Sequence, residues 1–122
     1  MTPVDAGSVV WDAVVEADVC IIGAGAAGIT LAREFAGAPI RVCLLESGGW
    51  GPDPKTQSLA VGRGVGLPYY PLVRSRLRYF GGSTNHWAGW CRPLDEQIFQ
   101  PRTWVPLSGW PLSRGDLLPY YE

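Results

Sequence analysis

Three glycines directly after an apolar run carry the clearest chemical signal in the sequence. Gly23, Gly25 and Gly28 form a G-x-G-x-x-G pattern that follows the apolar residues 17–22. In a strand–turn–helix unit, the first glycine allows a sharp turn and the second lets a pyrophosphate approach the backbone. The third lets the helix pack closely on the strand. The pattern therefore predicts a dinucleotide site.

The start of the predicted helix and a downstream acid complete this site. The backbone N–H groups of Ala26 and Ala27, with the positive end of the helix dipole, are expected to hold the phosphates. Glu46 lies 18 residues after Gly28, near the roughly 20-residue spacing of an acid that binds a ribose 2′-hydroxyl. An acid here would repel a 2′-phosphate, which disfavours NADP. The alternative is an ordinary βαβ unit with a tight glycine turn, which requires neither three glycines at this spacing nor the acid.

Hydrophobic periodicity indicates the elements that must position these residues. Strands are expected over about 17–22 and 40–46, because near-continuous apolar runs are typical of parallel strands buried on both faces. A helix is expected over 26–35, and the Gly-Ala-Pro run at 37–39 ends it. The fold class is therefore α/β, with a Rossmann-like βαβ unit. Two parallel strands cannot form a covered sheet alone, so we expect further strands from a longer chain.

The second half of the sequence is predicted to be rich in loops. Residues 52–73 show little periodicity and are expected to be irregular. The alternation over 74–80 places three arginines on one face if that segment is a strand. Ser113 and Asp116 form a capping-box pattern that predicts a last helix.

Composition excludes several classes of function. The 122 residues are 47% hydrophobic and 17% charged with a net charge of −1, so nothing points to nucleic acid or an anionic membrane as a partner. The three cysteines have no paired or metal-ligand spacing, which predicts no metal site and fits a reducing compartment. Neither a secretory signal nor an apolar run long enough to span a membrane is present. We therefore expect a cytoplasmic protein.

Downstream of the βαβ unit, several runs resemble a known family. The run Gly-Gly-Ser-Thr-Asn-His-Trp at 81–87, after the glycine fingerprint, resembles the glucose–methanol–choline (GMC) oxidoreductases. The runs Arg-Pro-Leu-Asp at 92–95, Ser-Gly-Trp-Pro-Leu at 108–112 and Leu-Leu-Pro-Tyr-Tyr at 117–121 look more like the branch with pyranose oxidases and sugar dehydrogenases. The fingerprint is shared by many flavoproteins, whereas the run at 81–87 is much more specific.

This resemblance implies FAD and an incomplete domain. Residues 1–16 would be a leader, and 17–122 the amino-terminal part of the FAD-binding domain of a two-domain flavoprotein. Glu46 would bind the adenosine ribose. A second segment would pass along the pyrophosphate and the flavin, through Gly82, Ser83, Thr84 and Asn85. The family transfers a hydride from an alcohol or sugar carbon to flavin N5, with a catalytic pair near its carboxyl terminus, so no catalytic residue is expected here.

His86, the single histidine, has two interpretations. In pyranose oxidases, the histidine before a tryptophan in the equivalent motif is bonded covalently to the flavin. This sequence differs from those oxidases in the residues between the glycines and the histidine. The alternative is a histidine that hydrogen-bonds or packs beside the flavin ring. Among the arginines, Arg78 is the best candidate to lie near the cofactor, since it precedes the Gly-Gly pair, although a solvated strand face is the ordinary role of such a trio.

Two other functions remain open at this stage. A different flavoprotein, such as an amine oxidase or a monooxygenase, shares the same fingerprint. A dinucleotide-binding module without chemistry of its own is the non-enzymatic alternative. The sequence names neither the substrate, nor the electron acceptor (oxygen, a quinone or a cytochrome), nor the oligomeric state.

Overall fold

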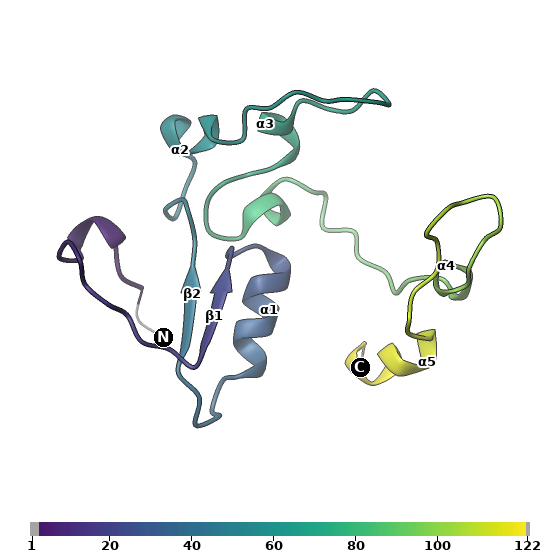
Figure 1. Cartoon of the computed structure of the whole chain (residues 1–122), viewed down its shortest axis with the longest axis horizontal. Coiled ribbons are helices and arrows are strands. Elements are labelled where there is room, and N and C mark those ends of the chain that lie inside the picture. Colours follow the sequence, from purple (N-terminus) through teal and green to yellow (C-terminus); the bar gives the residue numbers. More distant parts are fainter. Residues whose placement is uncertain (1–2, 122) are drawn as a thin grey trace. The chain divides into compact units, whose positions relative to one another are not determined.

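The computed structural model describes residues 3–121, so the predicted leader is seen from residue 3 onward. These residues fall into two compact units, divided between Ala88 and Gly89. The first begins with a short 3-10 helix, η1 (Ala6–Ser8), and continues into strand β1 (Val19–Ile22), helix α1 (Ala26–Glu34) and strand β2 (Val42–Leu45). Figure 1 shows the two strands side by side with α1 beside them.

The βαβ unit agrees with its prediction and is slightly shorter at each element. The strands are parallel, with Val19 opposite Val42 and Ile22 opposite Leu45. Helix α1 ends one residue before the predicted end, with Phe35 as its C-cap. Ile21 in β1 and Ala32 in α1 are buried, and a Cβ on Gly28 of α1 would lie 3.4 Å from the Ile21 Cγ2. A parallel pair joined by a crossover helix is the basic unit of dinucleotide-binding folds.

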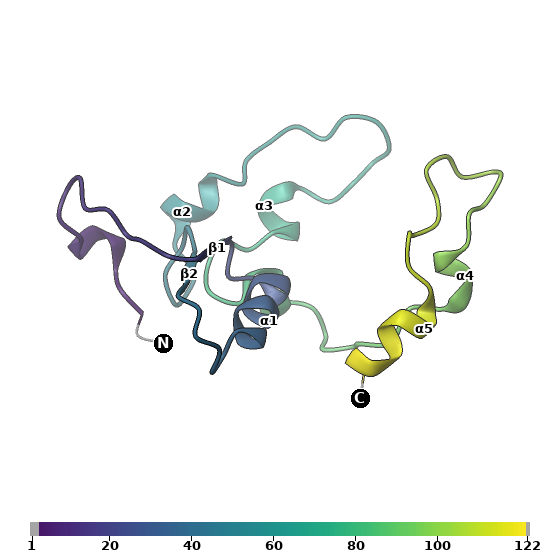
Figure 2. The ribbon, with the colours of Figure 1, turned by 60° about the horizontal axis from the view of Figure 1, so that its bottom comes forward.

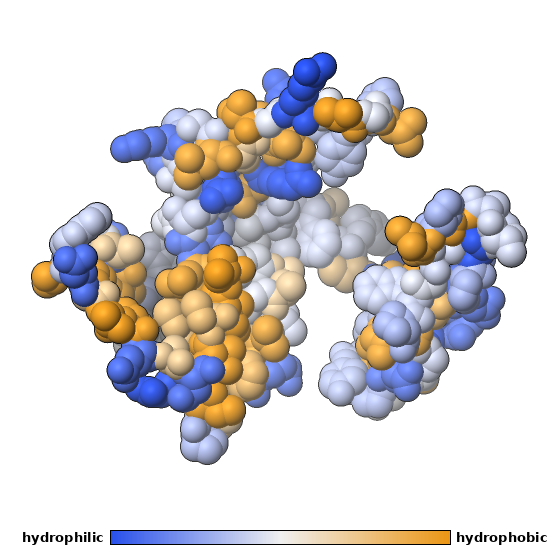
Figure 3. Space-filling model, viewed as in Figure 1, coloured by the Kyte–Doolittle hydropathy of each residue, from blue (hydrophilic) through white to orange (hydrophobic). Residues whose placement is uncertain are grey.

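One face of the strand pair is left open within this unit. Side chains alternate along a strand, so Ile22 points away from the face on which Ile21 is buried. Ile22 is 86% exposed and its partner Leu45 is 50% exposed. In Figure 3, hydrophobic residues accordingly gather at the surface over the two strands. The two strands therefore leave this apolar face without a covering layer inside the unit.

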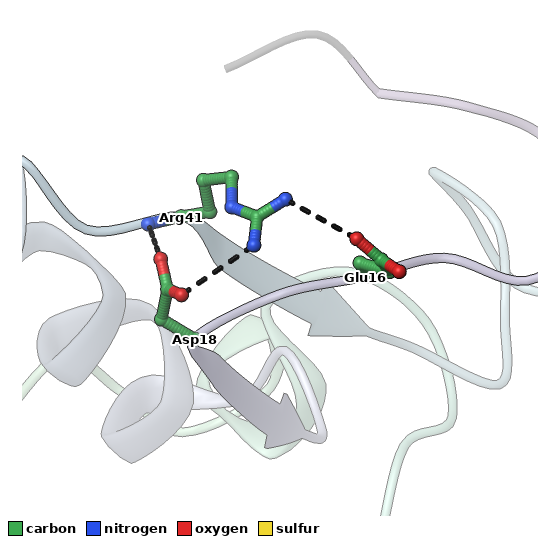
Figure 4. Close-up of polar contacts among 3 residues, drawn as sticks. All are labelled: Glu16, Asp18 and Arg41. Carbon is green, nitrogen blue, oxygen red and sulfur yellow. Dashed lines mark hydrogen bonds and ion pairs between the residues drawn. The ribbon is translucent and has the colours of Figure 1, made fainter.

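Polar contacts join the two strands where they begin. The Asp18 carboxylate accepts a hydrogen bond from the Arg41 backbone N–H at 2.8 Å, and the Arg41 guanidinium lies 3.5 Å from Asp18 and 3.8 Å from Glu16. Figure 4 shows Arg41 between the two acids. All three side chains are more than half exposed, and exposed ion pairs contribute little to stability. In parallel α/β sheets, ligands bind at the carboxyl ends of the strands. These ion pairs lie at the other end.

Two short helices correct the prediction that residues 52–73 are irregular. Helix α2 (Pro54–Ser58) begins at Asp53, whose carboxylate accepts a 2.6 Å hydrogen bond from the Thr56 N–H. Pro54 occupies the first turn, where its missing N–H costs nothing. Helix α3 (Leu72–Ser75) follows later in the same region. Both helices are too short to show a hydrophobic period. In the sequence, the Asp-Pro pair was the signal that indicated the start of α2.

The alternating segment 74–80 is not a strand. Arg74 belongs to α3, residues 76–78 have no regular secondary structure, and a bend and a turn follow at Tyr79 and Phe80. The three arginines therefore do not share one strand face. The backbone groups of Arg76 and Arg78 are instead bound by the side chain of Gln57, which alternation cannot predict. Of the three, Arg78 is half-buried, while Arg74 and Arg76 are exposed.

The second unit contains short helices joined by loops. Figure 2 shows a long loop between helices α4 (Glu96–Phe99) and α5 (Arg114–Leu117), and the 3-10 helix η3 (Leu118–Tyr120) follows α5. The predicted capping box is confirmed: the Ser113 and Asp116 side chains each accept a hydrogen bond from the other residue's backbone N–H. Across residues 3–121, no helix is long and apolar enough to cross a membrane.

Candidate functional site

Each glycine of the fingerprint is accommodated for a different physical reason. Gly23 has φ +100°, in the left-handed region that favours glycine, and its N–H donates to the Leu45 carbonyl at 2.7 Å. A Cβ on Gly28 would lie 1.9 Å from the Gly23 carbonyl oxygen, so only glycine allows α1 to approach this closely. Gly25 has φ −82°, and a Cβ there would meet nothing within 4 Å. The fold thus needs Gly23 and Gly28, whereas the glycine at position 25 only leaves space open.

The start of α1 faces this open space with free backbone donors. Gly25 is the N-cap and supplies no side chain to accept the first N–H groups of the helix. No acidic side chain occupies the first turn, so the positive end of the helix dipole is not neutralised there. Ala26 and Ala27, which follow Gly25, are both exposed. This arrangement suits a phosphate, since both the donors and the dipole favour an anion.

A segment far away in the sequence lies directly against the fingerprint. The Gly81 N–H donates to the Ala24 carbonyl at 2.8 Å, and Gly81 and Gly25 form an isolated parallel bridge. A Cβ on the buried Gly82 would lie 3.1 Å from the Gly25 Cα. The 3-10 helix η2 (Gly82–Asn85) begins at this contact. The fold therefore brings together the two segments that sequence reasoning assigned to one cofactor.

Two open surface pockets share residues of this contact, Gly25 among them. The first, of about 530 Å³, is lined by the start of α1 and by η2 with the residues after it: Ile22, Gly23, Gly25, Ala26, Ala27, Gly28, Ser83, Thr84, His86 and Trp87. The second, of about 620 Å³, is lined by the end of β2 and the extended arginine segment: Ile22, Gly23, Gly25, Leu45, Glu46, Ser47, Arg76, Leu77, Arg78, Gly82 and Ser83. We call them the His86 cavity and the Glu46 cavity. Both volumes lie in the range of small-molecule sites, roughly 300–1,000 Å³.

Glu46 is held at the end of β2 by backbone donors. Its Oε2 accepts from the Ala24 N–H at 2.8 Å, and its Oε1 accepts from the N–H groups of Ser47 at 2.9 Å and Gly48 at 3.2 Å. Partial burial raises the pKa of the Glu46 carboxyl, but these hydrogen bonds, with one from the Ser47 hydroxyl, outweigh burial and leave the pKa below its ordinary value. Glu46 is therefore an ionised acceptor that joins β2 to the glycine turn.

His86 lines the other cavity, beside Trp87. Its side chain is exposed, and its backbone N–H donates to the Ser83 carbonyl at 3.3 Å. Asn85 lines neither cavity. Its amide instead donates to the carbonyls of Phe80 at 3.0 Å and Gly82 at 2.9 Å. Asn85 thus shapes the turn that carries its neighbours, and the other predicted residues line one cavity or both.

Sequence reasoning missed several residues that build the Glu46 cavity. Arg76 and Leu77 line it beside Arg78, which the sequence had singled out. Gly48 packs against this segment, since a Cβ there would lie 2.0 Å from the Arg78 carbonyl oxygen. Gln57, from α2, binds the same segment through three hydrogen bonds. No local pattern marks Gln57, whereas the Gly48–Gly49 pair after Glu46 was a visible signal of close backbone approach.

Metal chemistry has no support in the described part of the chain. No group of three histidine, cysteine, aspartate or glutamate side chains there is placed to hold a metal ion. Cys20, Cys43 and Cys91 are all free.

Comparison with known proteins defines the class of this site. Residues 18–117 match the family model described as FAD dependent oxidoreductase, so the chain belongs to that family and its cofactor is FAD. The chain is also similar to the 2-methyl-1,2-propanediol dehydrogenase of Mycolicibacterium austroafricanum, with 34% identity over 131 residues. That match covers 88% of this chain and 23% of the relative, so the chain spans about a quarter of the relative's length. No solved structure matches the chain.

The residues present fit this cofactor. Space at Gly25, free donors at the start of α1 and an ionised acid at the end of β2 match a pyrophosphate with a ribose beside it.

Proposed function

We propose that this chain is the nucleotide-binding part of an FAD-dependent oxidoreductase that acts on the CH–OH group of an alcohol or sugar. The GMC-like run at 81–87 and the similarity to a relative named as a diol dehydrogenase support this substrate class. Because the chain spans 23% of that relative, we further propose that residues 17–122 are the first part of a longer FAD-binding domain.

The open space at Gly25 is the observation that carries this proposal. Neither its backbone angles nor its surroundings require glycine. Yet it lies at the α1 N-terminus, between the two cavities and against Gly82. A glycine that the fold does not need, beside free helix donors, is explained by a ligand that must approach the backbone there.

In this proposal the chain binds and orients the cofactor along the two cavities. The ribose hydroxyls donate to Glu46, and the phosphates accept from the N–H groups of Ala26 and Ala27. The flavin lies on the η2 side, near Ser83 and His86. When bound, FAD supplies the acceptor for a hydride from the alcohol carbon. We assign no catalytic base to any residue of this chain.

Cofactor analysis of Glu46→Ala tests the proposal in the complete protein. We expect the wild type to carry FAD, and the substitution to weaken FAD binding by about 1–3 kcal/mol, the cost of losing hydrogen bonds to a charged group. Glu16→Ala is the matched control, since it removes an exposed acid near the end of the sheet where the strands begin. A wild-type protein that carries no flavin and binds NADP would show the proposal to be wrong.

The substrate class is tested separately, by mixing the oxidised holoenzyme with candidate substrates without oxygen. Diols and sugars should bleach the flavin absorbance, whereas primary amines should not. Bleaching by amines alone would favour an amine-oxidising flavoprotein.

A further inference from the structure

We propose that Gln57 is a positioning residue for the nucleotide: it holds the Arg76–Arg78 wall of the Glu46 cavity in place. This inference rests on the proposed function, because it takes the Glu46 cavity as the place of the adenosine half of FAD. Gln57 lies in α2 and lines neither cavity. It therefore acts through the wall.

The Gln57 amide uses both of its ends on backbone groups of the arginine segment. Its Nε2 donates to the carbonyls of Val73 at 3.0 Å and Arg76 at 2.6 Å. Its Oε1 accepts from the Arg78 N–H at 3.0 Å. Two carbonyls at one end and an N–H at the other also decide the orientation of the amide, since the flipped amide would oppose all three partners. This side chain replaces the strand partner that the extended segment lacks.

Two further contacts position the same segment from other directions. The Ser83 hydroxyl accepts from the Leu77 N–H at 3.2 Å and donates to the Ser75 carbonyl at 3.3 Å. The Arg78 carbonyl packs against Gly48, whose N–H donates to Glu46. A continuous series of contacts thus joins Gln57 to the proposed ribose acid through Arg78 and Gly48. Releasing the segment would let the arginine wall move relative to Glu46.

The Arg78 side chain is also part of this wall. Arg78 lines the Glu46 cavity, and its buried Nε has no hydrogen-bond partner among residues 3–121. A buried donor without a partner is costly, and its place in the wall depends on the backbone that Gln57 holds.

Gln57→Met tests this inference in the complete protein, because methionine keeps the side-chain length and removes all three hydrogen bonds. We expect the dissociation constants of the apoprotein for FAD and for ADP to rise about tenfold, as for the loss of one to two net hydrogen bonds. With FAD at saturation, the flavin absorption spectrum and turnover should match the wild type, because none of the residues that Gln57 bonds lines the His86 cavity. Ser58→Ala is the matched control: Ser58 also lies in α2, but its hydroxyl bonds only the Lys55 carbonyl.

Gln57→Glu is a second variant of nearly the same shape, which guards against a folding defect in the first. It keeps the acceptor for Arg78 and loses both donors, so we again expect weaker binding of FAD and ADP with an unchanged spectrum at saturation. If both variants bind FAD and ADP like the wild type, the inference is overturned. It is also overturned if spectrum and turnover at saturation change as much as affinity, since the effect is then not confined to the Glu46 side. A wild type without FAD would refute the proposed function itself, whereas wild-type FAD binding with unaffected variants refutes only the role of Gln57.

Discussion

The Glu46 cavity and the His86 cavity share Ile22, two glycines of the turn and Ser83, and they differ in the other residues that line them. The Glu46 cavity is lined by an ionised acid that accepts from three backbone N–H groups, and by two arginines on a segment bound by Gln57 and Ser83. The His86 cavity combines small residues and free helix donors with two exposed aromatic side chains. The first cavity offers fixed acceptors for hydroxyl groups. The second offers N–H groups that can bind phosphate, and aromatic side chains that can pack against a ring.

In the proposed function, the two cavities take the two halves of a flavin dinucleotide. A ribose needs directional acceptors, which must be positioned before binding to be effective. A flavin ring needs space and flat neighbours, while the rest of its environment can come from other parts of a protein. Substitutions can test this difference between the two cavities. Some should damage both cavities, one should affect only the glycine turn, and others should affect only one cavity.

Gly28→Ala should have the largest effect and should damage both cavities. The new Cβ would lie 1.9 Å from the Gly23 carbonyl oxygen, so α1 and the turn must move apart. We expect the free energy of unfolding of the complete protein to fall by about 3 kcal/mol, the upper part of the range for overpacking, and FAD binding to be lost. Denaturant unfolding with flavin analysis checks both, and a stable variant with normal FAD content would contradict this packing.

Gly25→Ala should separate binding from folding. Its Cβ meets no protein atom within 4 Å and its φ of −82° suits alanine, so we expect the free energy of unfolding of the apoprotein to change by less than about 1 kcal/mol. FAD affinity should fall by about 2 kcal/mol, because the methyl group displaces a phosphate from its backbone donors. Titration of apoprotein with FAD measures this. Unchanged affinity would show that the pyrophosphate does not pass over Gly25.

His86→Ala should affect the flavin side only. We expect a shifted flavin spectrum and redox potential, and a loss in FAD affinity of about 1 kcal/mol, the size of one hydrogen bond. ADP, which lacks the flavin, should bind as it does to the wild type. We also expect acid precipitation of the wild type to leave the yellow colour in the supernatant. Colour in the pellet would instead demonstrate a covalent bond, and an unaltered spectrum and potential would remove His86 from the flavin.

Lowering the pH should have the smallest effect, a loss of folding stability as the Glu46 carboxylate is protonated. The pKa of Glu46 in the folded state is below its ordinary value of 4.5, so its carboxylate stabilises the fold above that value. This contribution is lost as the pH falls through the lowered pKa. The pKa values of Asp53 and Asp116 are lowered too, by hydrogen bonds to Thr56 and Ser113 respectively. The difference between wild type and Glu46→Gln therefore isolates Glu46: unfolding free energies of the two should converge below about pH 4.5, and parallel curves would contradict the role of these hydrogen bonds.

Elements with local signals were predicted well from the sequence. The glycine spacing located the turn and the start of α1, and the Ser113–Asp116 pair located α5. Apolar runs placed both strands to within about two residues. Each of these features depends on side chains within one turn or one strand, where periodicity and capping act.

The segment around Arg76 shows what local reasoning could not supply. Its alternation is compatible with a strand, but no strand of the described chain pairs with it. Side chains of Gln57 and Ser83 bind its backbone instead. The roles of these side chains depend on contacts between residues distant in sequence, which no short pattern encodes.

The sequence by itself determined the glycine fingerprint, the acid at the end of β2 and the βαβ unit that presents them. Only the tertiary structure decided that Gly82 packs on Gly25, that Glu46 and His86 line different but adjoining cavities, and that Gln57 binds the backbone of Arg78. The physical reason is the range of the interactions. Backbone conformation and capping are set by neighbouring residues, whereas a cavity forms where distant segments satisfy each other's hydrogen bonds and close packing.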